Sequence, residues 1–209
     1  MKFTPELGQA CEQLVQILAG SGIPYAVGGA VAMAFGGYLR GTHDLDVLVL
    51  IPALRYQEIA DALNAAGFVM RDENDRPATV EVPPMLRASR EMGHFRIWWA
   101  NTRVELFTPR VPLQDAVLQR RVQVDLDGLS VWVTTAEDLI LLKMIFHRPK
   151  DIEDVRRLLA ANRGSLDVAY IESWIPRTLE VPVGGELRRM LQQSGCTPGP
   201  GGIDPGVLP

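Results

Sequence analysis

The stretch that decides the fold is VGGAVAMAFGGYLRGTHDLDVLVL, residues 27–50. It places two adjacent glycines, Gly28 and Gly29, after a short apolar run, and two aspartates, Asp44 and Asp46, at the start of a longer one. The first run, the glycines and the small-residue stretch that follows predict a strand, a tight turn and a helix. The second run is continuously apolar after its aspartates, which predicts a strand near the middle of a sheet.

These residues also have the chemistry of a phosphate and metal site. Residues two apart on a strand point to the same face, so Asp44 and Asp46 would present two carboxylates side by side. Carboxylate and phosphate oxygens are the ligands that Mg²⁺ takes. The turn at Gly28 and Gly29 would let backbone N–H groups approach triphosphate oxygens, helped by the start of the helix. Thr42 precedes the aspartates closely enough to contact phosphates or the aspartates themselves.

The rest of the chain predicts a mixed α/β fold. Apolar spacing indicates amphipathic helices at 5–19 and 53–66, and two hairpins are expected within 94–108 and 120–133, the second turning at Asp127 and Gly128. Residues 134–164 read as two consecutive helices that meet near Pro149, with Thr134 and Glu137 as a cap for the first. We therefore expect a mixed sheet flanked by helices, an α/β (α+β) core, with a helical C-terminal region.

This pattern predicts three segments. Residues 1–134 would form the α/β core, residues 135–194 a helical region packed on it, and residues 195–209 a mobile tail, because the tail is rich in Gly and Pro and poor in apolar residues.

Composition narrows the class of protein. The 209 residues are 47% hydrophobic and 22% charged, as in ordinary globular domains, and the net charge of -4 argues against a protein that coats nucleic acid indiscriminately. This net charge does not exclude a local basic cleft. The first residues lack a signal peptide's apolar run, so we expect a cytoplasmic protein. Cys11 and Cys196 are not expected to pair, and no His or Cys spacing indicates zinc.

Two further segments carry a resemblance to a known family. Arg40-Gly41-Thr42-His43-Asp44-Leu45-Asp46 follows the glycine turn, and a helical lysine, Lys143, precedes Lys150-Asp151-Ile152-Glu153-Asp154-Val155-Arg156-Arg157-Leu158. The whole arrangement, from about residue 23 to 160, resembles the nucleotidyltransferase superfamily, and within it the AbiEii-like toxins of abortive-infection systems.

The resemblance implies roles for particular residues. Members usually add a third carboxylate on a later strand that faces the aspartate pair, and here the candidate is Glu105, between apolar Val104 and Leu106. Asp44, Asp46 and Glu105 would then hold Mg²⁺ or Mn²⁺. Arg is suited to bidentate contact with phosphate, so Arg40, which precedes the strand, is expected at the nucleotide.

The downstream lysine and acids have two readings. Lys143 lies in the apolar stretch LILLKMIF, where an unpaired ammonium is costly to bury, so it must reach a triphosphate or form a salt bridge with Asp151 or Asp154. Asp151 and Asp154 share a helical face and could hold Lys143, Arg148 or a ribose hydroxyl. Together with Lys150 they are expected to belong to the nucleotide site.

The sequence thus predicts a metal-dependent nucleotidyltransferase that moves an NMP from an NTP to an acceptor hydroxyl and releases pyrophosphate. The resemblance implies a tRNA or protein acceptor and a partner antitoxin. Two alternatives stay open. One is an inactive nucleotide-binding or partner-binding protein of the same fold, and the other is a small-molecule adenylyltransferase of the aminoglycoside type.

Overall fold

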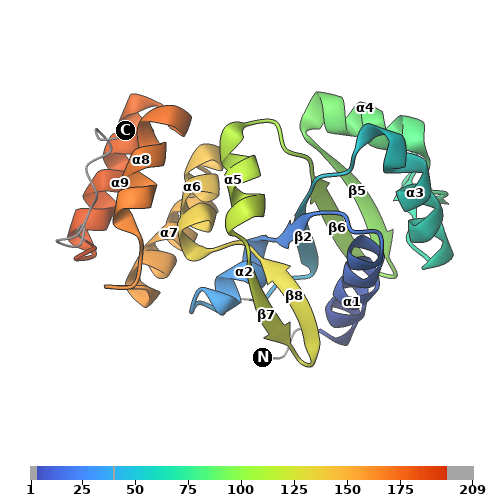
Figure 1. The fold of residues 1–209 in the computed structure, drawn as a ribbon, viewed down its shortest axis with the longest axis horizontal. Helices are drawn as coiled ribbons and strands as arrows, with labels where there is room; N and C mark the ends of the chain where they lie inside the picture. The colour runs from blue at the N-terminus through green and yellow to red at the C-terminus, as the bar shows by residue number, and fades with distance from the viewer. Residues whose placement is uncertain (1–3, 40, 197–209) are drawn as a thin grey trace, which may run out of the picture. The chain divides into compact units, whose positions relative to one another are not determined.

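The computed structural model describes residues 4–39 and 41–196. The described residues form two compact units, one of residues 4–35, 39 and 41–134 and the other of residues 36–38 and 135–196 (Figure 1). Of the tail expected to be mobile, residues 197–209 lie outside the described residues.

The first unit is built on a six-stranded mixed sheet in the order β5-β6-β2-β1-β8-β7. The strands are β1 (Tyr25–Val27), β2 (Asp44–Val49), β5 (His94–Trp99), β6 (Thr102–Phe107), β7 (Val122–Leu126) and β8 (Leu129–Val133). Strand β2 runs parallel to β6, and β1 runs parallel to β8, while the other neighbours are antiparallel. A separate two-stranded sheet joins β3 (Met70–Arg71) and β4 (Pro77–Ala78). The predicted mixed α/β architecture is confirmed.

Strands β2 and β6 each have one side that is apolar and one side that carries charged residues. Side chains alternate along a strand, and the same alternation occurs on β2 and on β6, which are in register. The side chains on one side of these strands are apolar and fully buried: Leu45, Val47, Val49, Val104 and Leu106. The opposite face carries Asp44 and Asp46 on β2, with Arg103 and Glu105 on β6. Burial of the apolar face therefore sets which way the charged side chains point.

Within its described residues the first unit has five α-helices. They are α1 (Pro5–Gly20), α2 (Gly29–Phe35), α3 (Tyr56–Ala65, preceded by the 3-10 turn η1, Ala53–Arg55), α4 (Val82–Met92) and α5 (Pro112–Arg120). Helix α1 packs against β2 and β6, and α5 against β1 and β2. Helices α4 and α5 were not predicted. Their signals were present, because each has proline in its first turn and α4 ends at Gly93, which adopts a left-handed conformation.

Both predicted hairpins are confirmed. Strands β5 and β6 turn at Ala100 and Asn101, and β7 and β8 turn at Asp127 and Gly128. Asp127 and Gly128 both have positive φ, at 52° and 91°. A two-residue turn of this kind matches the twist of the strands that it joins.

The second unit is helical. It contains α6 (Ala136–Phe146), α7 (Pro149–Ala161), α8 (Val168–Thr178) and α9 (Val181–Gln193), and α6 packs against both α7 and α8. The predicted pair of helices meeting near Pro149 is confirmed. The cap of α6 was placed one residue too early, since Thr135 Oγ1, not Thr134, accepts a hydrogen bond from the backbone of Asp138.

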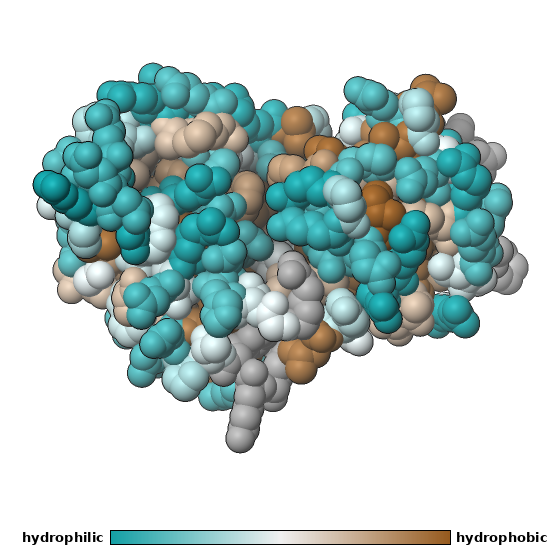
Figure 2. Space-filling view, turned by 180° about the vertical axis from the view of Figure 1, so that it is seen from behind, coloured by the Kyte–Doolittle hydropathy of each residue, from teal (hydrophilic) through white to brown (hydrophobic). Residues whose placement is uncertain are grey.

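The surface in Figure 2 is mainly hydrophilic, with small hydrophobic groups set apart from one another. The most exposed large hydrophobic side chains of the described residues are Leu39, Leu54 and Val181. None of the helices within residues 4–39 and 41–196 has the length and apolar character needed to cross a membrane.

Cys11 offers a direct test of the packing of α1. Its side chain is only 1% exposed, and burial raises the pKa of the thiol to about 12. Because the thiolate is the reactive form, we expect Cys11 in a Cys196→Ser background to resist iodoacetamide at pH 8. Mass spectrometry should detect rapid labelling only after denaturation in guanidinium chloride. Fast labelling of the folded protein would show that α1 is not packed as described.

Candidate active site

The polar side of β5, β6 and β2 forms what we call the carboxylate face, made of Asp44, Asp46, Arg96, Arg103 and Glu105. Two rows cross the strands. In one row Asp46 lies beside Glu105, which lies beside Arg96, and in the other Asp44 lies beside Arg103. The structure therefore brings together the three carboxylates that the sequence singled out, on neighbouring positions of two parallel strands.

Asp46 lies directly against the glycine turn. A Cβ built on Gly29 would come within 1.9 Å of Asp46 Oδ2, and Gly29 has a φ of +54°. Both facts require glycine, since a side chain would collide with the carboxylate and the backbone conformation disfavours other residues. The two features that stood out in the sequence are thus parts of one contact.

The two glycines have different roles. The backbone N–H of Gly28 donates a hydrogen bond of 2.8 Å to the Asp46 carbonyl oxygen, so it continues the pairing of β1 with β2. That N–H is not open to a phosphate in this structure. Helix α2, which begins at Gly29, is only seven residues long. A contribution from its N-terminus to triphosphate binding stays a prediction.

Two arginines form ion pairs with two of the carboxylates of this face, Asp44 and Glu105. The guanidinium of Arg103 lies 2.6 Å from Asp44 Oδ2 and 3.6 Å from Glu105 Oε1, and Arg96 donates to Glu105 Oε1 at 2.9 Å. Glu105 is the most enclosed of the four, with 15% of its side chain exposed, against 41% to 45% for Asp44, Arg103 and Arg96. On the carboxylate face, Asp44 and Glu105 are therefore ion-paired with arginines, and the five side chains together keep one net negative charge.

Neither arginine was identified from the sequence. Arg103 stands two residues before Glu105, so the alternation of β6 indicates that they share a face. The pairing of Arg96 with Glu105 follows only from the register of the β5–β6 hairpin. Cross-strand neighbours depend on register, which a single strand does not specify.

The segment before β2 is partly described. Thr42 Oγ1 accepts a hydrogen bond from the Asp44 N–H and donates one to the Asp44 carbonyl, both at 3.1 Å. Of its two predicted roles, contact with the aspartate pair is the one present here. Arg40 lies outside the described residues, so its predicted contact with phosphate stays a prediction.

The carboxylate face suits a divalent cation in its chemistry, because its three acids share one face and carboxylate oxygen is the donor that Mg²⁺ prefers. In residues 4–39 and 41–196, however, no three acidic, His or Cys side chains converge closely enough to hold a metal ion as they stand. Asp44 and Glu105 are instead ion-paired with Arg103 and Arg96. The residue types therefore fit a metal ion. A metal ion bound here would compete with the two arginines for these carboxylates.

The second unit holds the downstream charged residues in a cluster of their own, the Lys143 cluster, made of Lys143, Arg148, Asp151 and Asp154. Lys143 Nζ lies 2.6 Å from Asp154 Oδ2 and 3.7 Å from Asp151 Oδ1, and Arg148 Nε lies 2.6 Å from Asp151 Oδ2. Lys143 and both aspartates are buried. The predicted salt bridge of Lys143 is present, while its contact with a triphosphate stays a prediction.

The Asp151 carboxyl stays ionised despite its burial. Burial alone would raise its pKa, but the hydrogen bond and charge of Arg148, together with the charge of Lys143, outweigh that effect and lower the pKa below its ordinary value. Lys150, the other predicted nucleotide contact in this segment, is exposed.

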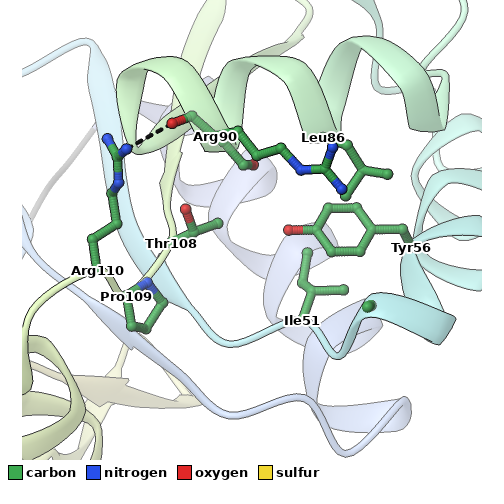
Figure 3. Close-up of a pocket in the computed structure, with 9 residues that line it drawn as sticks. Ile51, Tyr56, Leu86, Arg90, Thr108, Pro109 and Arg110 are labelled. Carbon is green, nitrogen blue, oxygen red and sulfur yellow. Dashed lines mark hydrogen bonds between the residues drawn. The ribbon is translucent and has the colours of Figure 1, made fainter.

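A separate pocket lies at the opposite end of β2 and β6 from Asp44. It is a cavity of about 460 Å³, lined by Ile51, Ala53, Tyr56, Leu86, Ser89, Arg90, Thr108, Pro109 and Arg110. Ile51 follows the end of β2, and Thr108 to Arg110 follow the end of β6, which runs parallel to it. Figure 3 shows Arg110 at one side of the pocket, where it donates a 2.6 Å hydrogen bond to the Arg90 carbonyl. The pocket contains none of the predicted site residues.

We expect Gly29→Ala to be destabilising. The substitution places a methyl group against the Asp46 carboxylate and forces alanine into a left-handed conformation, which by itself costs about 1–2 kcal/mol. Urea denaturation should show a lower midpoint. Gly28→Ala is the matched control, since its Cβ would meet nothing closer than 3.8 Å, and its effect should stay within about 0.5 kcal/mol. Equal midpoints for the two variants would contradict the Gly29–Asp46 contact.

We expect Lys143→Met to lower the free energy of unfolding by about 3–5 kcal/mol, because it leaves two buried carboxylates without their shared cation. Thermal and urea denaturation measure the loss. Lys150→Met removes the same charge from an exposed position and should change stability by less than about 0.5 kcal/mol. If Lys143→Met is as stable as Lys150→Met, the buried cluster is not formed in solution.

Several solved structures resemble this chain. The antibiotic-resistance factor ANT(2'')-Ia has 13% identity and a TM-score of 0.51, with 92% of this chain and 94% of that chain covered. A nucleotidyltransferase-like protein from Paracoccidioides brasiliensis has 15% identity and a TM-score of 0.48, with 91% and 89% covered. A putative nucleotidyltransferase from Thermotoga maritima has 15% identity and a TM-score of 0.48, with 76% and 95% covered. At these identities the likeness concerns the fold alone.

No curated protein matches the sequence significantly. A protein-family profile, described as "Nucleotidyltransferase of unknown function (DUF6036)", matches residues 23–188. The match includes the glycine turn, the carboxylate face and the Lys143 cluster, and it covers most of the chain. This protein therefore belongs to the DUF6036 nucleotidyltransferase family.

Proposed function

We propose that this chain transfers a nucleoside monophosphate from an NTP to an acceptor hydroxyl, in a reaction that depends on Mg²⁺ or Mn²⁺. The observation that carries the proposal is the contact between Asp46 and Gly29, with Glu105 beside Asp46 on the next strand. Like charges directly opposite each other on neighbouring strands are destabilising, so this pair of acids favours a role in binding a cation. Membership of a nucleotidyltransferase family supports the same conclusion.

The proposed reaction forms one bond and breaks one. The acceptor oxygen attacks the α-phosphorus, the bond between the α-phosphorus and the bridging oxygen of the β-phosphate breaks, and pyrophosphate leaves with that oxygen. The acceptor hydroxyl loses its proton, and Glu105, which is less exposed than Asp44, is the proposed acceptor of that proton. Such a displacement depends mainly on positioning and on neutralisation of charge.

In this proposal Asp44, Asp46 and Glu105 would hold the metal. A bound divalent cation would supply charge neutralisation at the phosphates and polarise the attacking hydroxyl. The protein's own contribution is to hold the three acids on one face and to keep the Gly29 side of Asp46 free of any side chain. Thr42 contributes by hydrogen-bonding the backbone of Asp44, which orders the start of β2.

The second unit would add nucleotide contacts. Lys150 has an exposed side chain that suits a phosphate. Lys143 and Asp154 are ion-paired with each other, so either would have to leave its partner to contact a nucleotide. We therefore propose that the Lys143 cluster mainly holds α6 and α7 together. Asp151, Asp154 and Arg40 would contact the nucleotide only in the bound state.

The acceptor proposal follows from the resemblance to AbiEii-like toxins. It comprises transfer to a tRNA or a protein, an antitoxin as partner, and action in the cytoplasm. A small-molecule adenylyltransferase is the competing enzyme class, favoured by the fold shared with ANT(2'')-Ia, an antibiotic-resistance factor. A nucleotide-binding or partner-binding protein without activity is the third candidate, and the pairing of Arg103 and Arg96 with two of the three acids favours it.

The test is transfer of label from each α-³²P NTP, with Mg²⁺ or Mn²⁺, to total tRNA, to a protein extract or to an aminoglycoside. We expect one nucleotide and one acceptor class to be labelled, with pyrophosphate released. Asp44→Ala and Asp46→Ala should reduce transfer to background, because each removes a proposed metal ligand. Mass spectrometry of RNA and protein from expressing cells, compared with Asp44→Ala, would identify the acceptor.

The matched control is Asp61→Ala, which removes an exposed aspartate from α3 and should leave transfer unchanged. Full transfer by both Asp44→Ala and Asp46→Ala would reject the proposed site. NTP binding without pyrophosphate release would instead favour the inactive alternative.

A further inference from the structure

Arg103 occupies a special place on the carboxylate face. Its guanidinium lies 2.6 Å from Asp44 and 3.6 Å from Glu105, so one cation links the first and the third of the proposed metal ligands. This position is set by the fold, because Arg103 is the direct cross-strand neighbour of Asp44 and stands two residues before Glu105 on β6. Arg96 differs, since it forms an ion pair with Glu105.

A guanidinium and a divalent cation are attracted to the same carboxylates. Arginine's planar group suits carboxylate oxygens, and Mg²⁺ takes those same oxygens. Because Arg103 already contacts Asp44 Oδ2 and Glu105 Oε1, a metal ion must either displace it from those oxygens or bind the other oxygens against its positive charge. The structure therefore contains a competitor for the metal within the site itself.

The pair is weak enough to be exchanged. Side chains of Asp44 and Arg103 are 41% and 42% exposed, so solvent screens their attraction. Exposed ion pairs contribute little, which corresponds to a change in a competing equilibrium of about fivefold or less per pair. Arg103 makes one such contact with Asp44 and a longer one, of 3.6 Å, with the less exposed Glu105, so it would weaken metal binding by about fivefold to tenfold without blocking it.

We propose that Arg103 is a built-in counter-cation that competes with the divalent metal for Asp44 and Glu105. Metal binding to the free protein is then weak. It becomes strong when an NTP arrives, because the triphosphate gives the displaced guanidinium a new anionic partner on the same face. Arg103 thus couples metal binding to nucleotide binding. This inference rests on the proposed function, and it adds a regulatory residue that the sequence motif does not contain.

The experiment measures binding of Mn²⁺ alone by electron paramagnetic resonance, in which bound Mn²⁺ loses the sharp signal of the free ion. We expect Arg103→Gln to bind Mn²⁺ about fivefold to tenfold more tightly than the unmodified protein. Arg188→Gln is the matched control, because it removes one guanidinium from a half-exposed ion pair with Glu172 in the second unit. Its Mn²⁺ affinity should equal that of the unmodified protein.

A second measurement tests the coupling. Each of the four NTPs is added at saturating concentration, and the gain in Mn²⁺ affinity is compared between the two proteins. We expect a smaller gain in Arg103→Gln, because the competitor is already gone. Arg103→Lys keeps the charge without the planar fork and should lie between the two. Thermal denaturation of each variant identifies any that does not fold, and Arg103→Lys then carries the comparison with the unmodified protein.

The outcomes separate the two proposals. If Arg103→Gln binds Mn²⁺ no more tightly than the unmodified protein, while Asp44→Ala abolishes binding, Arg103 is not a competitor and the proposed function stands. If neither protein binds Mn²⁺ with or without any NTP, the metal-dependent function itself is rejected, and the role of Arg103 with it.

Discussion

The structure of the site depends on the close approach between the Asp46 carboxylate and Gly29. The approach is possible only because residue 29 has no Cβ and adopts a left-handed backbone conformation. It connects the end of β1 with the start of β2, which are antiparallel neighbours in the sheet. The position of Asp46 in turn determines where its neighbour Glu105 meets it across the parallel strands. The glycine turn between β1 and α2 is thus also one side of the candidate site.

The ion pairs of the two units differ in their exposure to solvent. On the carboxylate face, Arg103 and Asp44 are each about two-fifths exposed, so their ion pair is screened and can be exchanged for a ligand. In the Lys143 cluster, Lys143, Asp151 and Asp154 are buried, and separating them would leave charges in a poorly solvated place. The first arrangement suits a site that must open to substrates. The second suits a structural role within a helical unit.

Much of the fold was predictable because it follows from local pattern. The glycine turn, the apolar run after Asp46 and the Asp127–Gly128 hairpin each have a short-range signal, and the structure has all three. Helices α4 and α5 were missed although Pro83, Pro112 and Gly93 marked their ends. The cap at Thr135 was placed one residue early, since two adjacent threonines are equally good cap residues and only the backbone geometry distinguishes them.

The sequence by itself determined which acids share a face, since Asp44 and Asp46 are two apart on a strand whose other side is wholly apolar. It also determined that Lys143 needs an anionic partner, because a lysine within an apolar helix cannot be left unpaired. Only the tertiary structure decided that Asp46 rests on Gly29, that Glu105 stands beside it, and that Arg103 holds Asp44. The physical reason is register: contacts between strands depend on how one strand is shifted along another, and burial of the apolar faces of β2 and β6 together selects that shift.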